Sequence, residues 1–245
     1  MFFGYLFLPL LLMVTAAFNT SSIPSVLPWR QFTLNWFAVL FQDALMWKSI
    51  LNSLVIALGV VVLAVPMGLS AALLLTRLQS KSQPFLYALL VSPILTPGVI
   101  LGISTLIFWN QMGIEGGLLL TVIGQTTFIA SFSMLIFMAQ LQRLDPALEE
   151  AALDLGASHL QTYIKVVFPY LKATFVTAAF ISFLQSFENY NTTLFVIGAD
   201  TTMTVKIASM IRLGLTPEVN ALSVIFVALT VLVAVLYTLL RKGEV

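Results

Sequence analysis

Few residues of this 245-residue chain have side chains that could carry out catalysis. The absence of cysteine excludes disulfides and thiolate chemistry, and the single histidine, His159, excludes a site that needs two imidazoles. A P-loop requires a Gly-Lys pair after a glycine turn, and the sequence has no such pair, no H-E-x-x-H and no G-x-S-x-G. We therefore expect no catalytic site, no metal site and no cofactor bound by this chain, with His159 an exposed or partner-facing side chain.

Glu188 is the acidic residue whose surroundings point most clearly to binding. It is the one charge within the stretch 173–199, and the side chains near it are polar: Gln185, Ser186, Asn189, Asn191, Thr192 and Thr193. A charged side chain at the centre of a membrane costs about 2.5–3.5 kcal/mol on insertion scales. Glu188 either meets a cationic substrate, with Gln185, Asn189 and Asn191 beside it on the substrate path, or bonds to neighbouring helices.

Three other groups of residues are candidates for lining a path through a membrane. They are Ser92 and Thr96 with the adjacent prolines Pro93 and Pro97, Pro66 with Gly68, and Gln125 with Thr126, Thr127 and Ser131. Proline frees backbone carbonyls, which must then bind water or a neighbouring helix. The alternative for each group is helix packing, because membrane helices favour small and polar residues where they touch.

The segment 143–172 holds a third of the chain's charges, at Arg143, Asp145, Glu149, Glu150, Asp154, Lys165 and Lys172. Asp145-Pro146 combines an N-cap acceptor with proline at the first helical position, and Gly156 suits the left-handed end of a helix. Ser158 and Gln161 have the spacing of a capping box. The segment therefore predicts two short helices joined by a tight turn.

The first of these helices presents a face built from the small residues Ala151 and Ala152, flanked by carboxylates. Such a face permits the close approach of another protein, and the carboxylates can bind arginine side chains on that partner. The alternative is an amphipathic turn exposed to water, which helical spacing does not exclude. We expect the second helix to end at Pro169, before a membrane span begins.

The string Glu150-Ala151-Ala152-Leu153-Asp154-Leu155-Gly156, followed after nine residues by Val166-Val167-Phe168-Pro169, resembles the EAA motif of ABC-importer permeases. That pattern reads E-A-A, three residues, G, nine residues, I, one residue and L-P. Val166 replaces the isoleucine and Phe168 the leucine, and both positions stay apolar. The motif has six informative positions at fixed spacing. Asn52-Ser53-Leu54 is also typical of these permeases.

The resemblance covers nearly the whole chain and implies the type I ABC-importer permease fold, with a cytoplasmic coupling helix between the fourth and fifth spans. It implies a heterodimer with a second permease subunit, two ATPase subunits that bind ATP and magnesium, and an extracytoplasmic substrate-binding protein. The chain itself is then a non-catalytic subunit of the bacterial inner membrane. The residues expected to couple it to the ATPase are Glu150, Ala151, Ala152, Asp154, Gly156, Ala157 and Ser158.

A second, shorter resemblance concerns the substrate. The heptapeptide Thr216-Pro217-Glu218-Val219-Asn220-Ala221-Leu222 is similar to the spermidine/putrescine permease subunits of the same family. It implies a polyamine or a related organic amine as the transported solute, which agrees with an acid at Glu188.

The elements that must position these residues are membrane helices. The chain is 60% hydrophobic and 9% charged, whereas about a quarter of a soluble domain is charged, and a net charge of +1 gives no support for nucleic-acid binding. Its apolar runs lack the alternation of apolar and polar residues that barrel strands have. Helices must therefore satisfy the hydrogen bonds of the backbone in lipid. We expect one all-α membrane domain over 1–245, with six spans near 2–19, 49–76, 84–109, 117–141, 171–197 and 219–241, and a coupling loop at 142–169.

Lysine and arginine predict the orientation of these spans in the membrane. If both termini are cytoplasmic, seven basic residues lie on inner segments and four on outer ones, as the positive-inside rule requires. The first apolar stretch lacks a basic start, so we interpret it as a span instead of a signal peptide, with room for a short basic tail before Met1. The segment 32–41 is either a helix on the outer interface or an ordinary packed loop.

Two other classes of membrane protein remain as alternatives. A secondary transporter runs on an ion gradient and usually has more intramembrane acids, bases or broken-helix repeats than this sequence. A membrane-embedded protease needs a Ser/His pair or two acids at membrane depth, whereas His159 lies outside the expected spans and Glu188 is the one deep acid.

Overall fold

The computed structural model describes residues 2–78, 80–214 and 216–241. Over these ranges the chain is helical, and its one β-type contact is an isolated antiparallel bridge between Asn19 and Phe32. The chain forms two compact units. The first consists of Met1–Lys48 and Lys206–Val245, and the second is the continuous segment Ser49–Val205.

The first unit is built on helices from both ends of the chain. It holds α1 (Phe2–Ala17), α2 (Asn35–Gln42), most of α11 (Met203–Leu213) and α12 (Pro217–Arg241). The long helix α12 packs against both α1 and α2. Lys206 Nζ lies 3.5 Å from Asp43 Oδ2, which ties α11 to the end of α2. The segment expected at 32–41 is therefore a helix, which begins at Asn35.

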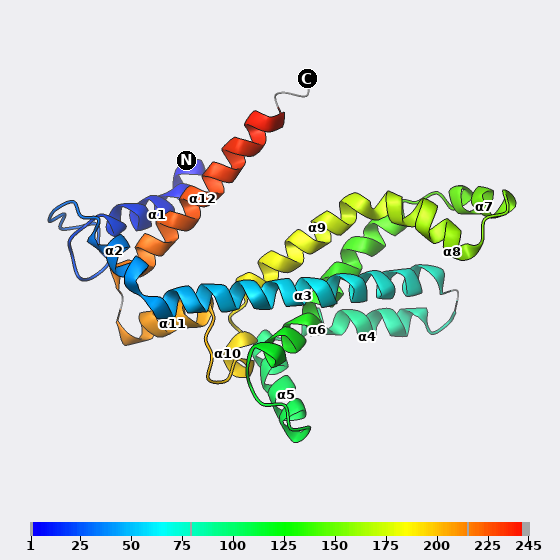
Figure 1. Ribbon diagram of the computed structural model, residues 1–245, viewed down its shortest axis with the longest axis horizontal. Coiled ribbons are helices and arrows are strands. Elements are labelled where there is room, and N and C mark those ends of the chain that lie inside the picture. The colour runs from blue at the N-terminus through cyan, green and yellow to red at the C-terminus, as the bar shows by residue number, and fades with distance from the viewer. Residues whose placement is uncertain (1, 79, 215, 242–245) are drawn as a thin grey trace. The chain divides into compact units, whose positions relative to one another are not determined.

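The second unit contains the residues singled out in the sequence (Figure 1). Its helices are α3 (Ala44–Arg77, of which the first turn belongs to the first unit), α4 (Gln83–Leu95), α5 (Gly98–Gln111), α6 (Leu118–Leu141), α7 (Pro146–Asp154), α8 (His159–Thr162), α9 (Phe168–Phe187) and α10 (Thr193–Val196). Helices α6 and α9 lie side by side. In Figure 1, α7 and α8 lie at one end of this unit, while α5 and α10 lie at the other.

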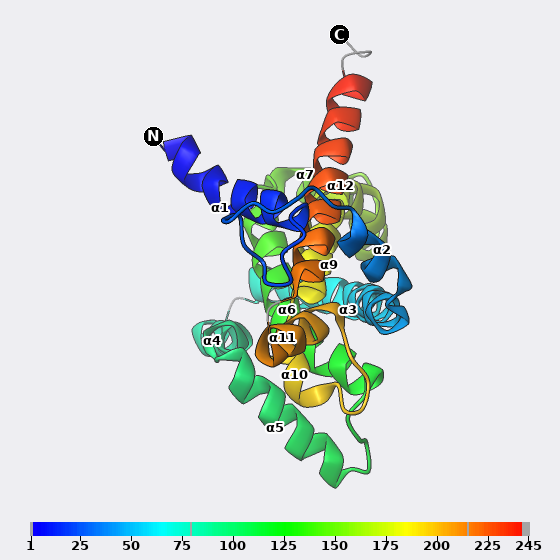
Figure 2. The same cartoon turned by 90° about the vertical axis from the view of Figure 1, so that its left-hand side faces the viewer.

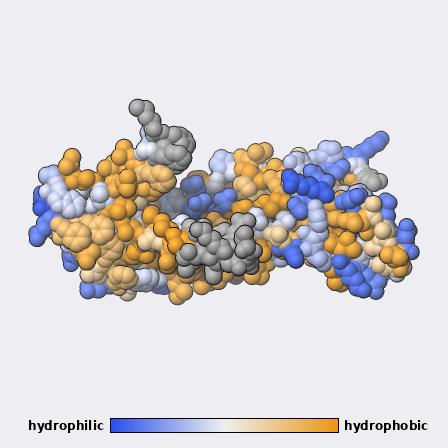
Figure 3. Space-filling model, turned by 90° about the horizontal axis from the view of Figure 1, so that it is seen from above, coloured by the Kyte–Doolittle hydropathy of each residue, from blue (hydrophilic) through white to orange (hydrophobic). Residues whose placement is uncertain are grey.

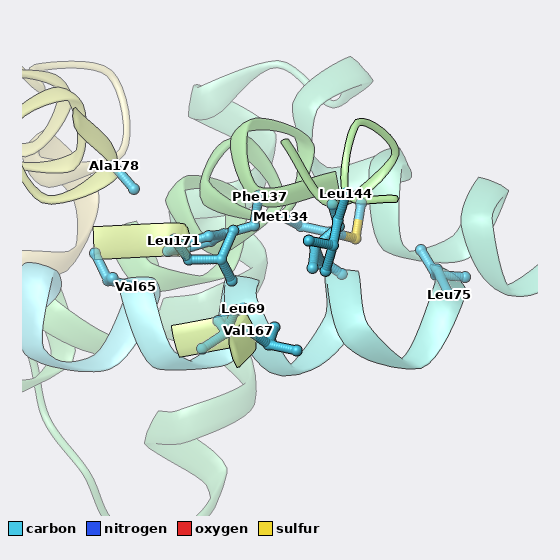
Figure 4. Packing of buried hydrophobic residues seen from close by; sticks show 11 residues of the cluster. Val65, Leu69, Leu75, Met134, Phe137, Leu144, Val167, Leu171 and Ala178 are labelled. Carbon is cyan, nitrogen blue, oxygen red and sulfur yellow. The ribbon is translucent and has the colours of Figure 1, made fainter. Parts of the chain in front are cut away.

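A continuous apolar core joins α3, α6 and α9 (Figure 4). Its buried members are Val65, Leu69, Ala72, Leu75, Met134, Phe137, Leu141, Leu144, Val167, Leu171 and Ala178. The Phe137 and Phe175 rings meet edge to face at a centroid distance of 5.0 Å, a favoured geometry for aromatic pairs. Leu144 and Val167 flank the segment that contains α7 and α8, so the core holds both ends of that segment.

Gly68 marks the closest approach of α3 to α6. A Cβ atom added at Gly68 would lie 2.4 Å from Ser133 Cβ and 2.7 Å from the backbone nitrogen of Met134. The helix α3 runs without interruption through Pro66. Of the two interpretations of Pro66 and Gly68, the structure therefore supports close helix packing at Gly68.

The pair Asn52-Ser53 connects α3 to the start of α11. Asn52 Nδ2 donates to the carbonyl of Thr201 at 2.9 Å, and the backbone N–H of Met203 donates to Ser53 Oγ at 2.9 Å. Both side chains are buried, so these bonds satisfy polar groups that would otherwise be left without partners inside the unit.

The expected span at 84–109 is not one straight helix. It consists of α4 and α5, whose axes differ by 102° (Figure 2). The bend lies at Thr96-Pro97, where Thr96 adopts the extended conformation that a following proline favours. The prolines of this region were expected to interrupt the hydrogen bonding, but the size of the bend was not predicted.

The segment expected as a span at 171–197 is a continuous helix only as far as Phe187. The helix α9 ends there, so Glu188 is its C-cap residue and does not lie inside a helix. The side-chain oxygen of Asn189 accepts the backbone N–H groups of Thr192 and Thr193 at 3.2 and 3.3 Å. These bonds hold the turn between α9 and the short helix α10.

Pro169 does not end the second short helix. Helix α8 continues through a π-helical turn at Tyr163–Val167 into α9, which gives an unbroken helical stretch from His159 to Phe187. The backbone N–H of Phe168 donates to the carbonyl of Tyr163, five residues earlier. Pro169 has no N–H to donate, and it lies in the first turn of α9, directly after the π-helical turn.

Three helices are long and apolar enough to cross a membrane: Ala44–Arg77, Leu118–Leu141 and His159–Phe187. The bent pair α4 and α5 raises this number to four if it counts as one span. The expected spans 2–19 and 219–241 form α1 and α12, in which the apolar helical stretches are the shorter Phe7–Ala17 and Pro217–Leu232. Six crossings and a single domain over 1–245 stay predictions.

Candidate functional site

A cavity of about 350 Å³ lies in the second unit, where α4 bends into α5 and where α9 ends. Its polar lining comes from two places in the sequence, the bend and the last turn of α9 with the turn that follows it. These residues are Thr96, Gln185, Glu188, Asn189, Asn191 and Thr192. The structure thus brings together five of the seven residues that the sequence placed on a substrate path.

The other two, Ser92 and Gln125, do not line this cavity. The Ser92 hydroxyl donates to the carbonyl of Leu89 at 2.8 Å within α4. Gln125 is 1% exposed in α6, where its amide nitrogen donates to Thr193 Oγ1 at 2.7 Å and its oxygen accepts from Ser186 Oγ. The Gln125 side chain is thus behind the cavity wall.

Three aromatic residues in the cavity lining were missed by the sequence analysis: Phe128, Phe132 and Tyr190. Phe128 and Phe132 lie one turn apart on α6, with ring centroids 6.2 Å apart at an interplanar angle of 81°. A helical face with Gln125, Phe128 and Phe132 at i, i+3 and i+7 is the signal that could have found them.

Two helix ends place negative partial charge at the cavity. Glu188 is exposed as the C-cap of α9, and α4 ends beside Thr96. The carboxyl end of a helix carries roughly half a negative charge. The amino ends of α5, at the bend, and of the short α10, at Thr192, have the opposite sign and offset these two ends. The Glu188 carboxylate is thus the negative charge of the cavity lining.

The coupling segment predicted from the sequence forms the local structure expected of it. Asp145 Oδ1 accepts the backbone N–H of Ala147 at 3.0 Å, and Pro146 begins α7. Ser158 and Gln161 form a capping box, with bonds of 2.9 and 3.3 Å. Gly156 has φ +87°, the left-handed conformation that favours glycine, so it ends α7 as predicted.

Most of the predicted coupling residues are accessible at the end of the second unit. Ala152 and Ala157 are half-buried, while the other five are exposed: Glu150, Ala151, Asp154, Gly156 and Ser158. Leu155 lies between them and is 89% exposed. Figure 3 shows hydrophilic residues gathered at its right-hand end, where Figure 1 places α7 and α8.

Arg77 fixes this segment from the end of α3. Its guanidinium forms an ion pair with Glu149 of α7, and its Cζ atom lies 5.8 Å from the centroid of the Tyr163 ring. Arg77, Glu149, Glu150, His159 and Tyr163 share the lining of a second cavity of about 320 Å³. Arg77 is one of the seven basic residues expected on inner segments, and this contact was not predicted because the two partners are 72 residues apart.

The described residues contain no group of three or more His, Asp or Glu side chains that could hold a metal ion. The arrangement therefore consists of a polar and aromatic cavity at one end of α9 and a surface-exposed helical segment at the other. One helical stretch, His159–Phe187, connects the two.

Comparison with known proteins gives both family and fold. The family described as "Binding-protein-dependent transport system inner membrane component" matches residues 64–243. The chain is 27% identical over 243 residues to the spermidine/putrescine transport system permease protein PotC of Escherichia coli K12, covering 99% of this chain and 91% of PotC. It is 28% identical over 230 residues to the putrescine transport system permease protein PotI of the same strain, covering 90% of this chain and 81% of PotI.

Solved structures of ABC importers share the fold. A bacterial ABC transporter that imports the acidic polysaccharide alginate matches with a TM-score of 0.71 at 18% identity, over 98% of this chain and 90% of that one. The inward-facing methionine ABC transporter MetNI matches with a TM-score of 0.60 at 18% identity, over 82% and 94%. The chain thus belongs to the family of binding-protein-dependent transport system inner membrane components and is a permease subunit of an ABC importer.

Proposed function

We propose that this permease subunit forms part of the path for a small organic cation of the polyamine class. The observation that carries the proposal is the 350 Å³ cavity, in which the Glu188 carboxylate and the rings of Phe128, Phe132 and Tyr190 line one space. A carboxylate binds an ammonium group by a charge-assisted hydrogen bond, and an aromatic face attracts it by about 0.5–2 kcal/mol.

The remaining lining residues suit a flexible chain of methylene and amine groups. Gln185 and Asn191 offer side-chain oxygens to N–H donors, while Ile94 and Leu101 provide apolar contact. The similarity to PotC and PotI, whose names describe spermidine and putrescine transport, supports the same substrate class here. Because the chain is about 27% identical to them, the cavity residues are the stronger argument.

The proposal includes the partners that an importer of this family needs. The exposed segment around α7 contacts one of two ATPase subunits, which bind ATP and magnesium, and this chain hydrolyses no nucleotide. A second permease subunit completes the path, and an extracytoplasmic protein delivers the solute. Support comes from the accessible Ala151 and Leu155 and from the family match.

The topology of the proposal is six membrane crossings with both termini in the cytoplasm. Helices α1 and α12 contain the apolar helical stretches Phe7–Ala17 and Pro217–Leu232, and they pack together in the first unit, as adjacent spans would. The excess of lysine and arginine on the inner segments favours this orientation over the reverse. A cysteine introduced at Glu244 tests this orientation, because the chain has no native cysteine. A membrane-impermeant thiol reagent should label it from the cytoplasmic side and not from the outer side.

The substrate proposal is tested with the complete transporter in proteoliposomes. Glu188→Gln keeps the size of the side chain and removes its charge, so the KM for spermidine uptake should rise about tenfold or more with little change in the amount of assembled complex. Glu115→Gln is the matched control, because Glu115 is an exposed carboxylate of the same unit that does not line the cavity.

Unchanged spermidine kinetics in Glu188→Gln would assign Glu188 to a structural role and remove the substrate proposal. A rise in KM of the same size in Glu115→Gln would also contradict it, because the effect would then come from general surface charge. Neither outcome would affect the assignment to the permease family, which rests on the match over 64–243.

A further inference from the structure

Gln125 connects three helices behind the cavity through a directed chain of hydrogen bonds. The Ser186 hydroxyl of α9 donates to Gln125 Oε1, and Gln125 Nε2 donates to Thr193 Oγ1 of α10 at 2.7 Å. The Thr193 hydroxyl then donates to Asn189 Oδ1 at 3.1 Å. Ser186, Gln125 and Thr193 are each at most 4% exposed, so the first two of these bonds are buried.

This series of hydrogen bonds also fixes the turn between α9 and α10. Asn189 Oδ1 also accepts the backbone N–H groups of Thr192 and Thr193, and the Thr204 hydroxyl donates to the carbonyl of Asn189 at 3.0 Å. The Thr192 hydroxyl donates to the carbonyl of Gly98 at 3.2 Å, at the start of α5. The turn 188–192 is thus fixed at both ends and against the bend.

The turn provides much of the cavity wall, while Gln125 itself provides none. Glu188, Asn189, Tyr190, Asn191 and Thr192 all line the cavity. Phe128 and Phe132, which also line the cavity, come from α6, the helix that carries Gln125. Gln125 therefore bonds the helix of the aromatic wall (Phe128 and Phe132) to the acidic wall (the turn 188–192).

We propose that Gln125 is a positioning residue for substrate selection, which holds the turn 188–192 at a fixed distance from the aromatic residues of α6. This inference rests on the proposed function, because it takes the cavity as the substrate path. Buried hydrogen bonds lose their stabilising effect when one partner is removed and leave the other unsatisfied. Loss of the Gln125 amide frees Ser186 and Thr193 to take other partners and moves the turn.

The test replaces Gln125 by methionine, which has a similar volume and forms neither bond. In proteoliposomes with the complete transporter, Gln125→Met should raise the KM for spermidine about five- to tenfold and leave the maximal uptake rate within about a factor of two. The preference between spermidine and the shorter putrescine should also become smaller, because the two walls are no longer held at one distance.

Ser133→Ala is the matched control. Ser133 of α6 and Ser182 of α9 form another buried hydrogen bond between the same two helices, at 2.9 Å. Neither residue lines the cavity or bonds to the turn. Ser133→Ala should therefore leave both the KM and the preference between the two polyamines unchanged, even if it lowers stability.

A double-mutant cycle separates positioning from general packing. Thr193→Val removes the next bond of the chain, so alone it should raise the KM as Gln125→Met does. Combined, the two substitutions should be no worse than either one, since they interrupt the same chain. Additive effects, or an effect on the maximal rate with an unchanged KM, would overturn the proposal and make Gln125 a packing residue.

The outcome also distinguishes this inference from the proposed function. If Glu188→Gln raises the KM and Gln125→Met does not, the cavity is the substrate path and the positioning role is wrong. If neither substitution changes the KM, the proposed function is wrong as well.

Discussion

Arg77, the last residue of α3, forms an ion pair with Glu149 in the first turn of α7. The Arg77 side chain is 43% exposed and that of Glu149 is 15% exposed. Glu149 also lies near the amino end of α7, where a negative charge is favourable. The core helix α3 and the exposed segment are thereby joined by a contact independent of the chain connections through Leu144 and Val167.

Exchange of the two charges of this ion pair should restore the ratio of solute imported to ATP hydrolysed that either single substitution lowers. Arg77→Glu places two acids together, so α7 should leave its position and the ratio of solute imported to ATP hydrolysed should fall several-fold. The effect on stability should stay below about 1 kcal/mol, because exposed pairs contribute little. Arg77→Glu combined with Glu149→Arg should recover most of the ratio, and failure to do so would show that Arg77 acts through Tyr163 instead.

The effect of a substitution at Gly156 should depend on the backbone conformation that the new residue prefers and not on the size of its side chain. Nothing lies within 4 Å of a Cβ atom added there, whereas φ is +87°. Gly156→Val should cost about 1–2 kcal/mol at the turn and reduce ATP-coupled uptake, while Gly156→Asn should lose much less. Equal losses in the two variants, at equal amounts in the membrane, would point to a steric requirement of the partner.

Gly68→Ala should destabilise the second unit by about 1–3 kcal/mol, as overpacking does, because the added carbon meets α6. Gly117→Ala is the matched control, since its φ of 162° is extended and nothing lies within 4 Å of the added carbon. Thermal unfolding of both variants in detergent measures the difference. A Gly68→Ala protein as stable as the control would mean that α3 and α6 can separate slightly.

Phe132→Leu should weaken binding of a cationic solute two- to fivefold, the loss of about 0.5–1 kcal/mol from one aromatic face. Phe108→Leu makes the same change on α5, where the ring is 51% exposed and outside the cavity. Uptake of spermidine by the two variants gives the comparison. An equal change in KM for both would indicate that lipid-facing aromatic residues, not the cavity, determine it.

The segment around α7 could be predicted almost residue by residue because its determinants are local. An N-cap, a proline, a left-handed glycine and a capping box each act within a few residues, and the structure has all four. The same is true of the family, since the EAA pattern has fixed spacing along the chain. The coupling role of the segment stays a prediction.

The ends of the fifth span could not be predicted from composition. Glu188 is the one charge of the stretch 173–199, and the polar residues that follow Phe187 were assigned to a substrate path inside the span, so an end of α9 at Phe187 was not predicted. In the structure these residues form a turn, in which Asn189 Oδ1 accepts from Thr192 and Thr193, and Thr193 in turn accepts from Gln125. This turn is bonded to a residue 64 positions before Asn189 in α6, which no local pattern contains.

Arg77 and the aromatic residues were missed for a related reason. A basic residue at the inner end of a span is expected from orientation alone, so the contact with Glu149 leaves no separate mark in the sequence. Phenylalanine on a membrane helix usually faces lipid or the core. Only the 102° bend after α4 and the early end of α9 open the space that Phe128 and Phe132 line.

Helix α9 is also a lever that ends at the acid. Its 20 residues, Phe168–Phe187, span about 30 Å at 1.5 Å per residue. A tilt of about 5° pivoted at one end would move the other end by about 3 Å over that length. Glu188 follows directly at the far end, so a small rotation imposed at the end next to α8 is sufficient to carry the acid across a distance comparable to the length of a hydrogen bond.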